Sequence, residues 1–159
     1  MKYLLPTILT IILAFALLIT DVRAESTDVV VTDNIIEAIH NIDIVSLNVL
    51  LAEGAAIDTA DGNGNTPLML ASKIGNPRMI KIILAHNPEV NIQNNDGYTA
   101  LMVASENGQY YVAAQLIRVG ADISAKNKQG LTAAEIALRF GQPQINNLIN
   151  GKKEVPFTR

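Results

Sequence analysis

The sequence predicts an all-α repeat solenoid, in which short helix–turn–helix units with β-turn or hairpin tips stack side by side. Three segments, starting at Asp61, Asn94 and Asn127, align without a gap at an interval of 33 residues. Periods of this length are typical of repeat folds, in which each unit buries its apolar face only against its neighbours. Hydrophobic residues make up 49% of the chain but aromatics only 4%, with no Trp, which suits thin layers of closely packed helices.

The first helix of each unit is predicted from four residue types that recur at the same interval. They are Gly64, Gly97 and Gly130; Thr66, Thr99 and Thr132; Ala71, Ala104 and Ala137; and Gly75, Gly108 and Gly141. The first glycines lie in Asn- and Asp-rich turns, and each Thr precedes an apolar stretch as an N-cap does. The alanines allow close helix approach, and the last glycines end the helix in the left-handed conformation. Thr132 with Glu135 forms a capping-box pattern.

A second helix follows in each unit. Pro67 suits the first position of the first helix, and Pro77 and Pro143 suit that position in the second. Apolar residues at i, i+1, i+4 and i+5 give the second helix one apolar face, as at Met79, Ile80, Ile83 and Leu84. Asn87 and Gly120 then end these helices, since both residue types tolerate a positive φ.

With these motifs the chain resembles the ankyrin-repeat family. The match is carried best by Gly64-Asn65-Thr66-Pro67-Leu68 and Gly120-Ala121-Asp122-Ile123, and it covers about residues 28–151. The sequence departs from the family pattern two positions after the Pro, where a His that bonds neighbouring repeats is replaced by Met69, Met102 and Glu135. We expect Met to pack there instead.

The repeat register gives units at about residues 28–60, 61–93, 94–126 and 127–151, followed by a loose tail at 152–159. About four units exceed the minimum of about three for a stable stack. The first unit is degenerate, with Asp33 at the capping position and Ile42 where Gly is expected. In the last unit Asn146 and Asn150 replace apolar residues, which predicts a polar outer face and a C-terminal cap.

Residues 1–24 have the features of a secretory signal peptide. Lys2 precedes an uncharged stretch over residues 3–20, and Val22-Arg23-Ala24 provides an Ala-x-Ala-like exit. We therefore expect cleavage after Ala24 and a periplasmic or secreted protein. The alternative is an uncleaved helix that anchors the chain in the inner membrane, facing the periplasm, because eighteen uncharged residues approach the length needed to span a bilayer.

Composition and spacing give no support for catalysis. The chain has no Cys, so disulfides and thiolate chemistry are excluded. His40 and His86 lie at unlike repeat positions without a carboxylate–His cluster, and Ser72 and Ser105 share one repeat position without a nearby base. A net charge of −3 without a basic stripe argues against nucleic-acid binding. We expect no enzyme activity, no cofactor and no metal.

The resemblance implies that one face of the stack binds another protein through turn tips and the exposed side of the first helices. Tyr and Arg often anchor interfaces, so Tyr98, Arg139 and Phe140 are the strongest candidates. The residues expected on this face are Asn63, Asn65, Lys73, Ile74, Asp96, Tyr98, Glu106, Asn107, Lys128, Gln129, Leu131, Arg139 and Phe140.

Two functions follow from these features. The favoured one is an exported, monomeric adaptor or scaffold that binds a partner protein, either in the periplasm or, as a secreted effector, in a host. The alternative is a membrane-tethered structural protein held by an uncleaved residue 3–20 helix. The mass of the processed chain distinguishes them, because cleavage at Ala24 removes the anchor.

Overall fold

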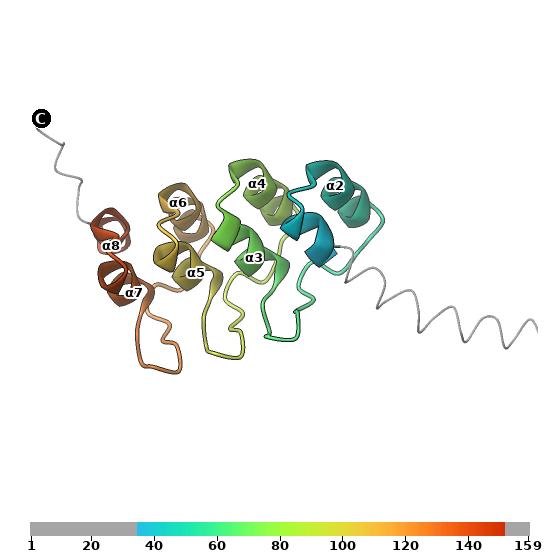
Figure 1. Ribbon diagram of the computed structural model, residues 1–159. Coiled ribbons are helices and arrows are strands. Elements are labelled where there is room, and N and C mark those ends of the chain that lie inside the picture. The colour runs from blue at the N-terminus through green and yellow to red at the C-terminus, as the bar shows by residue number, and fades with distance from the viewer. Residues whose placement is uncertain (1–34, 152–159) are drawn as a thin grey trace, which may run out of the picture.

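The computed structural model describes residues 35–151, which form a row of paired helices (Figure 1). A helical segment at residues 35–40 pairs with the first labelled helix, and each later pair follows in chain order. The labelled helices are α2 (Ile44–Ala52), α3 (Pro67–Ile74), α4 (Pro77–Ala85), α5 (Ala100–Glu106), α6 (Tyr110–Arg118), α7 (Ala133–Arg139) and α8 (Pro143–Ile149). The predicted all-α repeat solenoid is confirmed.

The helices of the inner layer begin where the sequence predicts. The Thr66 and Thr99 hydroxyls each accept a hydrogen bond from the backbone N–H three residues later, at 3.3 Å. Thr132 forms the complete capping box, donating its backbone N–H to the Glu135 carboxylate at 2.8 Å and accepting from the Glu135 N–H at 3.4 Å. Pro67 occupies the first turn of α3, where no N–H is needed.

Helix termination also follows the sequence. Gly75 caps α3 with a φ of +77°, and Asn87 follows α4 with a φ of +52°. Such left-handed residues let the last carbonyls of a helix be satisfied by the returning chain. Every predicted helix end therefore has a residue that tolerates this conformation, with one exception at Ile42, which adopts a φ of +55° although it is β-branched.

The helices pack in two layers. The inner layer is α3, α5 and α7, and the outer layer is α2, α4, α6 and α8, with contacts both within and between the layers. Both Met69 and Met102, which stand where a His is usual, are buried. The expectation that methionine fills this position by packing is confirmed. One continuous aliphatic core runs through the stack, and among residues 35–151 the aromatic rings packed against it are those of Tyr98 and Tyr110.

The loops before the inner helices project as a row of fingers (Figure 1). Within each finger the side-chain oxygen of Asp61, Asn94 or Asn127 accepts hydrogen bonds from the backbone N–H groups two and four residues later, at 2.8 to 3.0 Å. The fingers are turns, since residues 35–151 contain no strand. Neighbouring fingers are joined by Asn95 N–H to Asn63 carbonyl and by Lys128 N–H to Asp96 carbonyl, each 3.0 Å.

The last unit carries the predicted polar substitutions. Asn146 donates its side-chain amide to the Ala134 carbonyl at 3.1 Å, and Asn150 donates its amide to the Asn146 carbonyl at 2.9 Å. Across residues 35–151, no helix combines the length and hydrophobicity that crossing a bilayer requires. The predicted signal peptide, the Asp33 cap and the 152–159 tail lie outside the described residues.

Candidate protein-binding groove

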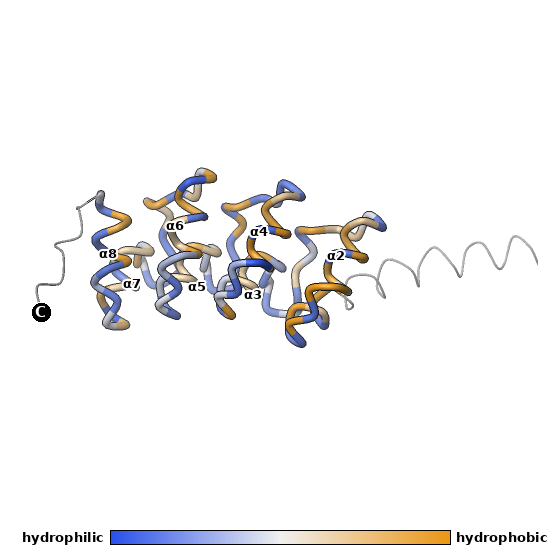
Figure 2. Tube along the Cα trace, turned by 90° about the horizontal axis from the view of Figure 1, so that it is seen from above, coloured by the Kyte–Doolittle hydropathy of each residue, from blue (hydrophilic) through white to orange (hydrophobic). Residues whose placement is uncertain are grey.

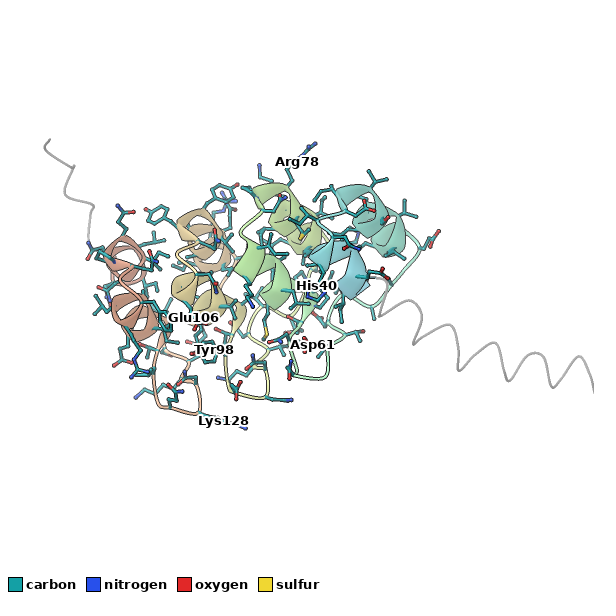
Figure 3. The ribbon with its side chains drawn as sticks, in the orientation of Figure 1. His40, Asp61, Arg78, Tyr98, Glu106 and Lys128 are labelled. Atoms are coloured by element: carbon teal, nitrogen blue, oxygen red, sulfur yellow. The ribbon has the colours of Figure 1, made fainter. Side chains whose placement is uncertain are left out.

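A groove of about 670 Å³ lies between the fingers and the inner helices α3 and α5, with Phe140 at the end of α7 also in its lining. Its lining comes from successive repeats, so it runs along the stack. Figure 3 shows Tyr98, Glu106 and Lys128 near one another on the finger side. The lining residues are Asn65, Met69, Leu70, Lys73, Asn94, Asp96, Tyr98, Val103, Glu106, Asn107, Lys128, Gln129 and Phe140.

The groove has an apolar floor and a charged rim. Leu70 and Val103 occupy the same repeat position on α3 and α5 and are almost completely buried, so the floor is shaped by the core itself. Lys73 and Glu106 also share one repeat position, at the ends of these helices, and contribute opposite charges. Lys128 adds a further positive charge from the third finger. A partner segment with both signs of charge would therefore meet complementary groups.

Tyr98 lines the groove and is held in place by its own finger. Its backbone N–H donates to the Asn94 Oδ1 at 2.9 Å, and its carbonyl accepts from the Asn94 N–H at 3.0 Å. The phenol is half-buried, and burial together with the negative charge of Glu106 raises the pKa of Tyr98 above its ordinary value. The phenol therefore stays protonated at neutral pH and offers an O–H donor beside an apolar ring.

Tyr98 also interrupts a side-chain ladder along the fingers. Asn94 Nδ2 donates to Asn65 Oδ1 of the preceding finger at 2.7 Å. Asn127 occupies the next finger at the equivalent position, where Tyr98 stands in place of Asn65. The side-chain amide of Asn127 therefore faces the Tyr98 phenol, where the preceding pair of fingers has an amide–amide hydrogen bond.

The far wall of the groove is formed by the C-terminal end of α7. Phe140 caps this helix, and 47% of its side chain is exposed. Arg139 lies beside it and donates to Gln129 Oε1 at 3.1 Å. This bond ties the last finger to the helix and leaves Arg139 just outside the lining, whereas Gln129 and Phe140 belong to it.

The structure brings together most of the residues expected on the binding face. Those that line the groove are Asn65, Lys73, Asp96, Tyr98, Glu106, Asn107, Lys128, Gln129 and Phe140. Asn63 lies on a finger tip outside the groove, and Ile74 and Leu131 pack against the core. Four further lining residues were not expected on this face: Met69, Leu70, Asn94 and Val103. The sequence does carry a pattern that could have identified the floor, because Leu70 and Val103 recur one position before the small residues Ala71 and Ala104.

The two histidines are not brought together. His40 is exposed on the 35–40 segment, and His86 caps α4 with its Nδ1 3.0 Å from the Ile82 carbonyl oxygen. Within residues 35–151, no group of three or more His, Asp or Glu side chains is arranged to hold a metal ion. The groove instead presents aromatic, amide and oppositely charged side chains, which are the groups that protein surfaces use to bind partners.

A row of helix pairs that carries turn fingers and a groove beneath them defines a helical-repeat scaffold. The family model for ankyrin repeats, in three copies, matches residues 35–127. The chain therefore belongs to the ankyrin-repeat family, whose repeats are generally protein–protein interaction modules. A search of curated proteins found no significant match to the chain.

Proposed function

We propose that this protein is a non-catalytic scaffold whose groove binds an extended segment of a partner protein. The observation that carries the proposal is that Tyr98 and Phe140 both line one groove with an apolar floor and a rim of mixed charge. Aromatic anchors surrounded by polar groups are typical of binding hot spots.

The groove favours a chain segment over a small molecule. Its volume falls within the range of ligand pockets, but its lining is distributed over successive fingers and inner helices. An extended segment spans about 3.3 Å per residue and can follow these repeats, contacting each in turn. Lys73 and Glu106 then set its direction, because a reversed segment would meet like charges.

Affinity capture from extracts of the source cell tests this proposal. The binding variant is Tyr98→Asn with Phe140→Asn, in which each position takes the residue found at the same place in the preceding repeat, Asn65 and Asn107. The matched control is Tyr111→Gln with Leu138→Ser, which takes Gln144 and Ser105 as templates and removes exposed apolar groups outside the groove.

We expect a protein that the wild type and the control retain and that the folded binding variant loses. Retention by all three chains, or loss from the control as well, would show that the groove is not the contact face. Circular dichroism confirms that each variant is folded before capture.

We further propose that the chain is exported and cleaved after Ala24, which places the scaffold in the periplasm or outside the cell. The support is the basic start, uncharged centre and small-residue exit of residues 1–24. The intact mass of the protein purified from its source cell tests this. A chain that begins at Glu25 is expected, and a chain that retains Met1 in the membrane fraction would favour the tethered structural alternative.

A further inference from the structure

The ends of the inner helices place different chemical groups along the groove. Lys73 and Glu106 occupy the same repeat position, in the last turns of α3 and α5, and both line the groove. Among residues 35–151, neither side chain has an ion-pair or hydrogen-bond partner. Phe140, one residue beyond the equivalent position of α7, lines the groove as well. Three successive repeats therefore present a positive charge, a negative charge and an aromatic ring, in this order.

The packing of the inner helices sets the distance between these groups. Helix α3 contacts α5, and α5 contacts α7. Figure 2 shows these three helices following one another along the stack when it is seen from above. The Gln109 side-chain amide donates to the Lys73 carbonyl at 3.4 Å, which ties the end of α3 to the next repeat. Packed helices lie about 8–10 Å apart, so equivalent side chains of successive repeats recur at about that interval.

A polyproline II segment has a period that matches this interval. It completes a turn every three residues with a rise of about 3.1 Å each, so its side chains at i, i+3 and i+6 share one face about 9 Å apart. In a β-strand the side chains on one face are about 7 Å apart at i and i+2, and about 13 Å apart at i and i+4. Only the polyproline II period therefore allows one side-chain contact per repeat.

The polar lining of the groove suits the backbone of such a segment. Polyproline II has no internal hydrogen bonds, so its carbonyl groups need donors from outside. Arg139 donates to the Gln129 Oε1 at 3.1 Å, which leaves the Gln129 amide N–H groups to donate into the groove that this residue lines. The protonated phenol of Tyr98 is a second donor, and its ring provides the aromatic surface on which prolines pack.

We propose that the groove binds a polyproline II segment with an acidic residue, a basic residue three positions along, and a proline or other apolar residue three positions beyond that. The acidic residue pairs with Lys73, the basic residue with Glu106, and the apolar residue packs on Phe140. Asp96 adds negative charge beside the central position, and Lys128 disfavours a second basic residue at the third. This inference rests on the proposed function and adds the conformation and charge spacing of the partner.

Fluorescent heptapeptides of a single composition test the spacing. Each contains one Asp, one Arg and five Pro, with Asp at one end and Arg two, three or four positions from it. A fourth peptide keeps the three-position spacing but replaces the prolines by Thr and Val, which favour a β-strand. Each is also made in reversed order, because the groove fixes the order of the charges along the stack and not the chain direction. Fluorescence anisotropy with the protein purified from its source cell gives each dissociation constant.

Charge reversal at Lys73 tests the contact itself. Lys73→Glu is expected to weaken binding of the three-position Asp–Arg peptide at least fivefold. The same variant is expected to bind a peptide with Arg at both positions at least fivefold more tightly than the wild type does. Lys81→Glu is the matched control, because Lys81 is exposed on α4 outside the groove and the change in net charge is the same.

We expect the wild type and Lys81→Glu to bind the three-position proline peptide at least fivefold more tightly than the other spacings and the Thr and Val peptide. Equal affinity for all spacings, tighter binding of the Thr and Val peptide, or no binding of any peptide would overturn the inference. If a captured partner protein still requires Tyr98 and Phe140 in those cases, the groove remains the binding face and only the inferred partner chemistry is wrong.

Discussion

The contact between neighbouring fingers makes a sharp prediction about two glycines. Gly97 and Gly130 have the same φ of +78° and the same repeat position. A Cβ added at Gly97 would lie 2.8 Å from the Lys128 backbone N and 3.0 Å from the Asn127 Cα, whereas a Cβ at Gly130 meets no atom within 4 Å. Comparing Gly97→Ala with Gly130→Ala therefore separates two free-energy costs. Both variants pay for the left-handed backbone conformation, and only Gly97→Ala also pays for steric overlap with the next finger.

The magnitudes follow from these contacts. An Ala in the left-handed region costs about 1–2 kcal/mol relative to Gly, so Gly130→Ala is expected to lose about this amount. Gly97→Ala loses the same amount plus about 1–3 kcal/mol for overpacking against backbone that cannot move aside. The Lys128 N–H donates to the Asp96 carbonyl at the point of contact, at 3.0 Å, so relief of the clash would weaken this bond.

Urea denaturation followed by circular dichroism measures both variants. We expect the midpoint to fall in both, with a drop at least one and a half times larger for Gly97→Ala and an unchanged m-value. Equal losses would mean that the fingers are not in close contact, and a larger loss for Gly130→Ala would refute the stacking register itself.

Three further outcomes are expected. Ile42→Gly should raise the free energy of unfolding by about 1 kcal/mol in urea denaturation, because Ile42 is half-exposed and holds a positive φ, whereas Ile42→Val should give no gain. Tyr98→Asn should leave thermal stability within about 1 kcal/mol, because the new amide oxygen can accept from Asn127 Nδ2 as Asn65 does from Asn94, while partner binding in a pull-down is lost. Burial raises the pKa of Asp61, but hydrogen bonds from Asn65 and Asn63 outweigh this effect and hold that pKa below its usual value. The ionised Asp61 therefore stabilises the fold above about pH 4, and this stabilisation is lost as the pH falls. Asp61→Asn should make the free energy of unfolding less dependent on pH in the acidic range.

The repeat interval predicted most of the fold because each recurring residue has one local role. Thr66, Thr99 and Thr132 cap helices through bonds to N–H groups only three residues away, so no tertiary information is needed to place them. The burial of Met69 and Met102, which stand where the family has a His, was also predictable. A flexible apolar side chain fits a buried position without requiring a specific partner.

The groove was less predictable because its shape arises between repeats. Leu70 and Val103 look like ordinary core residues in the sequence, and only the stacking of α3 on α5 turns their outer edges into a floor. The half-burial of Tyr98 and its position beside the Asn127 amide likewise depend on the neighbouring finger. At Ile42 the sequence indicated a missing Gly, and the structure shows that the chain retains the positive φ without it.

The central claim is that the groove is the face that binds a partner protein. A photo-reactive phenylalanine analogue placed at position 98, with the same analogue at Val119 as a matched probe outside the groove, tests this most directly in the source cell. The account predicts one discrete protein adduct from position 98 that is absent from position 119. No adduct at 98, or the same adduct from both positions, would contradict it.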